Sequence, residues 1–309
     1  MNDAVIVVSG LQKRYGSTVA VADVSLEVAR GEIFGLIGPN GAGKTTTMEC
    51  VEGLRRADGG TVSVLGLDPR RDAAALGQRI GVQHQEAHLQ KRIKVWEAID
   101  LWGSLYSRVV DTEALLSQLG LETKRNAWFM TLSGGQKQRL FVALALIHDP
   151  EVVFLDEPMS GLDPLGRRQV RDLILGLRAK GTTVFFSSHI LSDAETLCSR
   201  VAIMAQGRLA ATGRISEMVA FQLKGWELVV SGVTDDLQAA LAPKVAEIRP
   251  LSQGRFTLRI APDQKPERLM AELSSAGASV ESLHPVRDTL EDYFVQQVTA
   301  AKARDTGGL

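Results

Sequence analysis

The chain has 309 residues, 45% of them hydrophobic and 23% charged, which is typical of a soluble globular protein with one large and one small domain. A formal net charge of −1 excludes a whole-molecule attraction to nucleic acid or anionic lipid, so we predict no nucleic-acid partner. Two cysteines, Cys50 and Cys198, lie far apart and in no metal-ligand spacing, which favours a reducing compartment over a disulfide framework. We expect no signal peptide, and no stretch approaches the roughly 18 apolar residues of a membrane span. If the protein works at a membrane, another chain must hold it there.

The first 85 residues predict strands that lead into a glycine-rich loop. The run Glu32–Gly38 is apolar and ends in glycine, the form of a buried strand that enters a phosphate-binding loop. We expect a helix to follow directly, over Lys44–Val51. Further strands are predicted at Val5–Val8, from Val19 onward and at Arg79–Val82, with Gln85 just beyond the last of these.

From about residue 86 to residue 150 the pattern becomes helical. Apolar residues recur close to every 3.6 positions, and Asp111 and Ser133 are residue types that cap helices. The predicted helices are Val95–Arg108, Thr112–Leu119 after Asp111, and Gly134–His148 after Ser133. Strands and helices then alternate, which predicts a largely parallel sheet covered by helices. The predicted strands are Val152–Leu155, Thr182–Ser187 and Val201–Met204, and the predicted helices between them are Pro164–Ala179 and Ser192–Leu197.

After about residue 224 the order of elements changes. It becomes β-α-β-β-α-β, which is the order of a small ferredoxin-like sandwich. The predicted elements are strands at Trp226–Val233, Val245–Pro250, Arg255–Ile260 and Ser279–Leu283 and helices at Asp235–Leu241 and Pro266–Ser275. A final helix is predicted over Asp288–Val298.

The loop before the first helix fits the phosphate-binding pattern G-x-x-x-x-G-K-[ST] at every fixed position. Its glycines let backbone N–H groups curl around the β- and γ-phosphates of a nucleotide. Lys44 adds a positive charge, and Thr45 offers a hydroxyl to Mg²⁺. The predicted nucleotide-binding residues of this segment are Gly38, Pro39, Asn40, Gly41, Ala42, Gly43, Lys44, Thr45 and Thr46.

Two acids follow the strand Val152–Leu155. An apolar strand that ends in an acid is a weak pattern alone, but it is strong beside a phosphate loop. Asp156 is predicted to hold Mg²⁺, and Glu157 is placed to polarise an attacking water. The alternative is that Glu157 is merely a surface acid at a strand end.

The whole span from residue 1 to about 220 resembles the nucleotide-binding subunit of an ATP-binding cassette (ABC) transporter. Leu132–Gln136 is the family's signature without alteration, and Ser160–Asp163 matches the loop that follows the second acid. The resemblance implies an α/β P-loop NTPase cassette of the ABC type over residues 1–224, with its helical subdomain at about 86–150. A small α+β, ferredoxin-like domain would follow over residues 225–309.

The resemblance also implies roles for single residues. Tyr15 stands where the family stacks an aromatic ring on adenine, and His189 matches the switch histidine near the γ-phosphate. Gln85, favoured over Gln83 by its register, matches the glutamine that contacts Mg²⁺ and links to the membrane partner. Plainer alternatives are a packing role for Tyr15 and a turn-capping role for His189. One departure is His84, where the family commonly has proline, and it leaves the coupling geometry open.

The signature has a physical reason. Its serine and glycine amides sit at a helix N-terminus, where partial positive charge and free donors favour an anion. In the family this anion is the γ-phosphate of ATP held by the opposite subunit. The resemblance therefore implies nucleotide binding by Ser133, Gly134, Gly135, Gln136 and Asp163, with ATP and Mg²⁺ as cofactors. It also implies a second nucleotide-binding subunit, most simply a copy of this chain, and an integral membrane permease that holds the pair at the cytoplasmic side of the membrane.

The C-terminal segment bears on the direction of transport. Asp288–Phe294 is similar to the S/T-L-E-D-x-F close of drug-resistance-type export ATPases, including the daunorubicin-resistance type, which favours an exporter over an importer. The plainer alternative is an amphipathic terminal helix that only packs. The expected cargo is a drug, an antibiotic or a lipid-like molecule, with polysaccharide and small-peptide export also open. The alternatives are an importer ATPase, a non-transport ABC ATPase acting on ribosomes or DNA, and a module that binds ATP without hydrolysis. The chain lacks the second cassette or long coiled coil of the non-transport types. Glu157 and His189 argue against a non-hydrolysing module.

Overall fold

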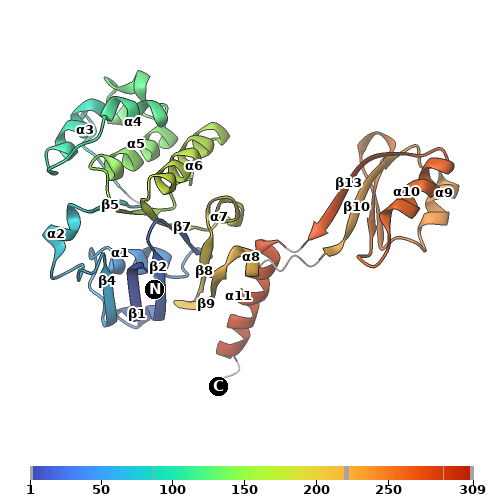
Figure 1. Ribbon diagram of the computed structural model, residues 1–309, viewed down its shortest axis with the longest axis horizontal. Helices are drawn as coiled ribbons and strands as arrows, with labels where there is room; N and C mark the ends of the chain where they lie inside the picture. The colour runs from blue at the N-terminus through green and yellow to red at the C-terminus, as the bar shows by residue number, and fades with distance from the viewer. Residues whose placement is uncertain (1–2, 86, 219–222, 288, 307–309) are drawn as a thin grey trace. The chain divides into compact units, whose positions relative to one another are not determined.

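The computed structural model describes residues 3–85, 87–218, 223–287 and 289–306. The chain divides into two compact units, Met1–Ile215 together with Phe294–Leu309, and Ser216–Tyr293 (Figure 1). Each unit has a hydrophobic core of its own. Among the described residues, no helix is both long enough and apolar enough to cross a bilayer.

The first unit is built on a nine-stranded mixed sheet. Neighbouring strands of its parallel half, β8, β3, β7, β6 and β5, all run in the same direction. The other half pairs β1 with β2 and β4 in antiparallel fashion, so the expectation of a largely parallel sheet holds only for the half that carries the predicted phosphate loop. In spatial order the strands are β4 (Gly59–Val64), β1 (Ala4–Tyr15), β2 (Thr18–Ala29), β9 (Arg208–Arg214), β8 (Arg200–Ala205), β3 (Ile33–Ile37), β7 (Thr183–Ser188), β6 (Val152–Asp156) and β5 (Ile80–Gln83).

The central strands are buried because helices cover both of their faces. Every residue of β3, β6 and β7 is buried, as apolar runs in parallel sheets require. On one face Val184 and Phe186 join a core with α5 and α6, while on the other Phe185 joins a core with α1. The helices that follow these strands are α1 (Lys44–Val51), α6 (Pro164–Ala179) and α7 (Leu191–Leu197).

The predicted helical segment is helical, but its three predicted helices, which end at Arg108, Leu119 and His148, run past the observed ends. Its helices are α3 (Val95–Gly103), α4 (Thr112–Gln118) and α5 (Gly134–Leu146), with short 3-10 turns η1 (Glu122–Lys124) and η2 (Phe129–Thr131). The first was predicted to reach Arg108, but it ends at Gly103. Beyond it the ring of Tyr106 stacks on His148, with centroids 3.8 Å apart, so a tertiary contact takes over from the helical pattern. Residue 86, where the predicted segment begins, lies outside the described residues.

The second unit has the predicted order of elements. Its strands are β10 (Leu223–Ser231), β11 (Glu247–Pro250), β12 (Arg255–Ile260) and β13 (Ser279–Arg287), and its helices are α9 (Asp235–Leu241) and α10 (Pro266–Ser275). The sheet order β11-β12-β10-β13 places β12 between β10 and β11, and β10 between β12 and β13. Both β-α-β crossovers are therefore split by a third strand, as the ferredoxin-like arrangement requires.

Several short elements have no counterpart in the sequence prediction. They are β4, β9, α2 (Ala73–Gly77) and α8 (Ile215–Met218). The last helix, α11 (Leu290–Thr306), runs further than the predicted Asp288–Val298, and Asp288 lies outside the described residues.

Candidate functional site

The phosphate loop joins the carboxyl end of β3 to the start of α1. Lys44 is buried and donates hydrogen bonds from Nζ to the carbonyl oxygens of Gly38, at 2.8 Å, and Pro39, at 3.3 Å. The ammonium is therefore folded back into the loop, and the N-terminal amides of α1 face the same space. The predicted loop and the predicted helix are thus joined in the way that the phosphate-binding motif requires.

Two of the loop glycines are required by close packing. A Cβ on Gly43, whose φ is +98°, would lie 2.3 Å from the carbonyl oxygen of Ala20. A Cβ on Gly38 would lie 2.5 Å from the carbonyl oxygen of Met204. By contrast, Gly41 has open space where its Cβ would lie, which leaves the loop accessible to a ligand.

The two predicted acids lie at the carboxyl end of β6, and Ser187 of β7 holds them. The Ser187 hydroxyl donates to Asp156 Oδ1 and accepts a 3.0 Å hydrogen bond from the backbone N–H of Glu157. Burial raises the pKa of Asp156, and hydrogen bonds from Ser187 and Thr45 oppose that rise. Glu157 has a φ of +52°, a strained value for a non-glycine residue, which turns its side chain out of the strand direction.

The carboxylate of Glu157 lies between two groups that the sequence predicted for phosphate chemistry. Its Oε1 lies 3.4 Å from Lys44 Nζ, and its Oε2 lies 2.7 Å from His189 Nδ1. The Glu157 side chain is only 6% exposed, whereas the His189 side chain is 41% exposed. The histidine thus presents its ring to solvent while one nitrogen holds the buried acid.

Gln85 reaches the same cluster from the end of β5. The Thr45 hydroxyl donates to Gln85 Oε1 over 3.4 Å. Gln83, the alternative glutamine, is buried and donates to the carbonyl oxygens of His84 and Asp156, so its role is to tie β5 to β6. His84 Nδ1 lies 3.3 Å from a buried carboxylate oxygen of Glu52, at the end of α1.

A pocket of about 400 Å³ lies over the phosphate loop. It is lined by Thr18, Val19, Ala20, Asn40, Gly41, Ala42, Gly43, Lys44, Thr45, Thr46, Gln85 and Glu157. The sequence prediction missed the contribution of Thr18–Ala20 and the role of Ser187. The signal for the first was the strand beginning at Val19, soon after Tyr15. No comparable signal marked Ser187, because its role depends on the pairing of β6 with β7.

The signature residues lie elsewhere in the first unit. Ser133 caps α5 by accepting from the Gln136 N–H at 3.2 Å, and the Gln136 side chain accepts from the Ser133 N–H at 3.0 Å. Ser133 and Gly134 are exposed, and a Cβ on Gly134 would meet nothing within 4 Å. None of the residues from Ser133 to Gln136 lines the pocket over the phosphate loop.

Asp163 and Tyr15, which were also predicted to bind nucleotide, lie outside that lining as well. Asp163 caps α6 by accepting from the Gly166 N–H at 2.9 Å, which accounts for its carboxylate in this structure. Tyr15 is 41% exposed at the end of β1, and the cations of Lys13 and Arg55 lie 5.6 and 5.2 Å from its ring centre. An exposed ring of this kind is available for stacking on a base.

The residues predicted for Mg²⁺ fit that ion by their chemistry. Thr45, Gln85 and Asp156 supply a hydroxyl, an amide oxygen and a carboxylate, which are the hard oxygen donors that Mg²⁺ prefers. Thr45 lies between the other two, since its hydroxyl is within hydrogen-bond reach of Gln85 Oε1, at 3.4 Å, and of the Asp156 carboxylate. The set leaves positions for water and phosphate oxygens, as Mg²⁺ sites usually do.

Comparisons with known proteins identify the family of the chain. The family described as ABC transporter matches residues 21–160. An uncharacterized ABC transporter ATP-binding protein of Synechocystis sp. is 39% identical over 282 residues, which cover 89% of this chain and 77% of that protein. The daunorubicin resistance ATP-binding protein DrrA3 of Streptomyces coeruleorubidus is 35% identical over 304 residues, 96% of each chain. A solved ATP-binding subunit of an ABC transporter is 28% identical, with a TM-score of 0.65 over 70% of this chain and 92% of that one. The chain belongs to the ATP-binding, ATP-hydrolysing proteins of ABC transporters.

Proposed function

We propose that this chain powers an ABC exporter, that it works as a head-to-tail pair around two ATP molecules, and that it drives a separate membrane permease. The observation that carries the proposal is the position of the Glu157 carboxylate between Lys44 and His189. An acid so placed beside a phosphate loop is suited to hydrolysis rather than to binding alone. The pair would work at the cytoplasmic side of the membrane, held there by the permease.

The proposed chemistry assigns a step to each of these groups. Lys44 and the loop amides bind the β- and γ-phosphates, and Glu157 polarises the attacking water. His189 holds Glu157 through Nδ1 and offers the rest of its ring to the γ-phosphate. Mg²⁺, held by Thr45, Gln85 and Asp156, would neutralise charge on the phosphate oxygens. Tyr15 stacks on the adenine.

The head-to-tail pairing is supported by where the signature lies. The pocket over Lys44 draws no lining residue from Ser133 to Gln136, although Ser133 and Gly134 are exposed at the N-terminus of α5, where a helix favours an anion. A second copy can bring its α5 to this pocket, and a two-fold axis then completes both sites at once. Leu162 lies beside Gly135, so its neighbour Asp163 is close to the signature glycines. Asp163 would therefore lie at the same interface.

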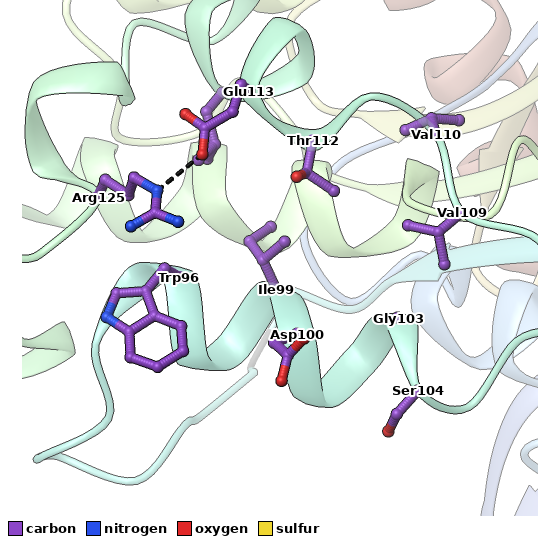
Figure 2. Close-up of a pocket in the computed structure, with 11 residues that line it drawn as sticks. Trp96, Ile99, Asp100, Gly103, Ser104, Val109, Val110, Thr112, Glu113 and Arg125 are labelled. Carbon is purple, nitrogen blue, oxygen red and sulfur yellow. Dashed lines mark hydrogen bonds and ion pairs between the residues drawn. The ribbon is translucent and has the colours of Figure 1, made fainter.

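The permease would dock on the helical subdomain. A pocket of about 320 Å³ lies between α3 and the start of α4, with the buried Ile99 among its lining residues (Figure 2). Beside Trp96, an ion pair of 2.7 Å joins Arg125 and Glu113. Leu105 is 61% exposed on the same segment. A hollow with a mixed polar and apolar lining is suited to receive a cytoplasmic segment of the permease.

Export is favoured over import by the similarity to a drug-resistance protein along nearly the whole chain, including the C-terminal unit. A drug or a lipid-like molecule is therefore the proposed cargo. None of the observations above gives comparable support to a role in import.

A mixing experiment tests the pairing and the site together. Lys44→Ala disables the phosphate loop of a chain, and Ser133→Arg disables the signature that a chain lends to its partner. Each variant alone should be inactive, with ATP binding retained by Ser133→Arg. Mixed in equal amounts, they should recover about a quarter of wild-type ATPase activity, because half of random pairs are mixed and each mixed pair has one intact site.

The matched control mixes Lys44→Ala with Glu157→Gln. Each change disables the half-site that contains the chain's own phosphate loop. No pair of these variants therefore has an intact site, and no activity should return. Recovery in the control, or none in the first mixture, would contradict the head-to-tail arrangement. Glu157→Gln alone should bind ATP and accumulate as a dimer in gel filtration.

A further inference from the structure

Helices α6 and α7 both begin at the edge of the catalytic cluster. Asp163 caps the start of α6, and the residue before it belongs to the loop that follows the catalytic acid. His189 lies two residues before the start of α7. The two helices pack against one another in the first unit (Figure 1). Whatever fixes α7 against α6 therefore also fixes His189 relative to the Ser160–Asp163 loop.

A charge pair with a buried acid and a half-buried arginine joins these helices. Arg171 of α6 places Nη2 3.4 Å from Oδ1 of Asp193, which lies in the first turn of α7. Asp193 is 1% exposed, and a carboxylate taken so far from water depends strongly on its cation. The pair is thus a polar link between the two helices.

The ion pair forms only one of the two contacts that its charged groups can make. Arg171 Nε and Asp193 Oδ2 are both buried, and neither has a hydrogen-bond partner in the described part of the chain. Guanidinium and carboxylate groups can form two parallel hydrogen bonds, and the two atoms left over here belong to the same pair. A small shift of α7 against α6 can therefore bring Nε to Oδ2 and close the second contact.

We propose that Arg171 and Asp193 are positioning residues for His189, acting as a clasp with one contact in this structure and two when the catalytic loops close on ATP. This inference rests on the proposed function for its link to hydrolysis. It assigns a role to two residues that touch neither the phosphate-loop pocket nor the proposed metal ligands. The Ser160–Asp163 loop before α6 would lie at the interface of the pair. The clasp would therefore also couple closure of one ATP site to the position of His189 in the other site.

The test compares two conservative changes on one helix. Arg171→Lys keeps the charge but cannot make two parallel contacts, while Arg168→Lys changes an arginine whose side chain is 78% exposed on the same helix. Arg171→Lys should lower kcat about tenfold through misplacement of His189, with the affinity for ATP unchanged. Arg168→Lys should match the wild type in both.

A second readout does not depend on hydrolysis. The chain has five histidines, so ¹⁵N-histidine NMR can resolve His189, assigned through its loss in His189→Gln. The His189 resonance should shift or broaden in Arg171→Lys and in Asp193→Asn, and stay in place in Arg168→Lys. Unchanged kcat and an unchanged His189 resonance in Arg171→Lys would overturn the proposal. A wild type without ATPase activity would instead overturn the proposed function, and the NMR comparison would still decide the clasp.

Discussion

Lys44 is the residue whose partners set the state of the catalytic cluster. Its ammonium is shared between two loop carbonyls and Glu157, and the phosphate oxygens of ATP would compete with Glu157 for it. In the proposed mechanism, displacing Glu157 from Lys44 would leave its carboxylate with His189 and expose one side of it to water. Lys44 would thus hold the proposed base until phosphate arrives and keep it from acting earlier.

Glu52 should make the stability of the protein depend on pH. Burial is the main reason that the pKa of its carboxyl is raised to about 9 from an ordinary 4.5. Between those values the folded chain keeps a proton that the unfolded chain has released, so the free energy of unfolding falls as pH rises. Glu52→Gln should flatten this dependence and raise stability at pH 8 by about 2 kcal/mol or more, measured by urea unfolding from pH 5 to 9. The exposed Glu122→Gln is the control, and an equal slope in both variants would contradict the assignment.

Gly43 and Gly176 should respond oppositely to alanine. In the phosphate loop, Gly43→Ala forces a Cβ into the Ala20 carbonyl at a positive φ, and should cost about 2–3 kcal/mol. On α6, Gly176 lies in a helix with open space at its Cβ, so Gly176→Ala should add up to about 1 kcal/mol. Thermal unfolding of both variants decides the matter, and similar shifts in the two would show that the loop tolerates a side chain.

At the level of elements, caps made by side chains define the helical subdomain. The Asp111 carboxylate accepts from the Glu113 and Ala114 N–H groups at the start of α4, each at 3.1 Å. Asp111→Ala should lower the free energy of unfolding by about 1 kcal/mol, and Asp111→Asn by much less, because asparagine still caps. ATPase activity should not change, since Asp111 lies outside the phosphate-loop pocket. A loss of activity without a loss of stability would contradict a purely capping role.

Elements with local signals were predictable from the sequence. Helices α1, α6, α9 and α10 were predicted with their observed bounds, because each has a proline, a glycine or a cap at its ends. Strand β12 was also predicted with its observed bounds. Strands β4 and β9 were missed, because the first begins with two glycines and the second is built of small and charged residues. Their extended form comes from pairing with β1 and β8, which a single sequence does not contain.

The residues of the site were likewise predictable where they belong to one contiguous motif. Residues in contiguous motifs, such as Lys44, Thr45 and Glu157, come together as the motifs require. Ser187 and the link between Arg171 and Asp193 were not predictable, because they join neighbouring strands or helices that lie far apart in the chain. The binding and catalytic roles of all these residues, including Ser133, Asp163 and Tyr15, remain predictions.

At the level of the whole molecule, the two units have separate cores. The core of the second unit is made by its own sheet and helices, with Leu228, Leu258 and Leu273 fully buried in it. Leu228→Ala should therefore destabilise that unit by about 3 kcal/mol and leave ATP affinity unchanged. Hydrogen exchange should accelerate in peptides from residues 223–287 and not in those from β3 or β6. Equal acceleration in both units would show that they unfold together.

The absence of signature residues from the lining of the chain's own phosphate-loop pocket has a kinetic consequence. Under the proposed pairing, the turnover per molecule of the isolated chain depends on how often two molecules meet, so dilution should slow it toward zero. A permease that holds two copies side by side would remove that dependence on concentration. The permease would then activate ATP hydrolysis as well as use its energy. Copies of the chain that are not bound to the permease would consume little ATP.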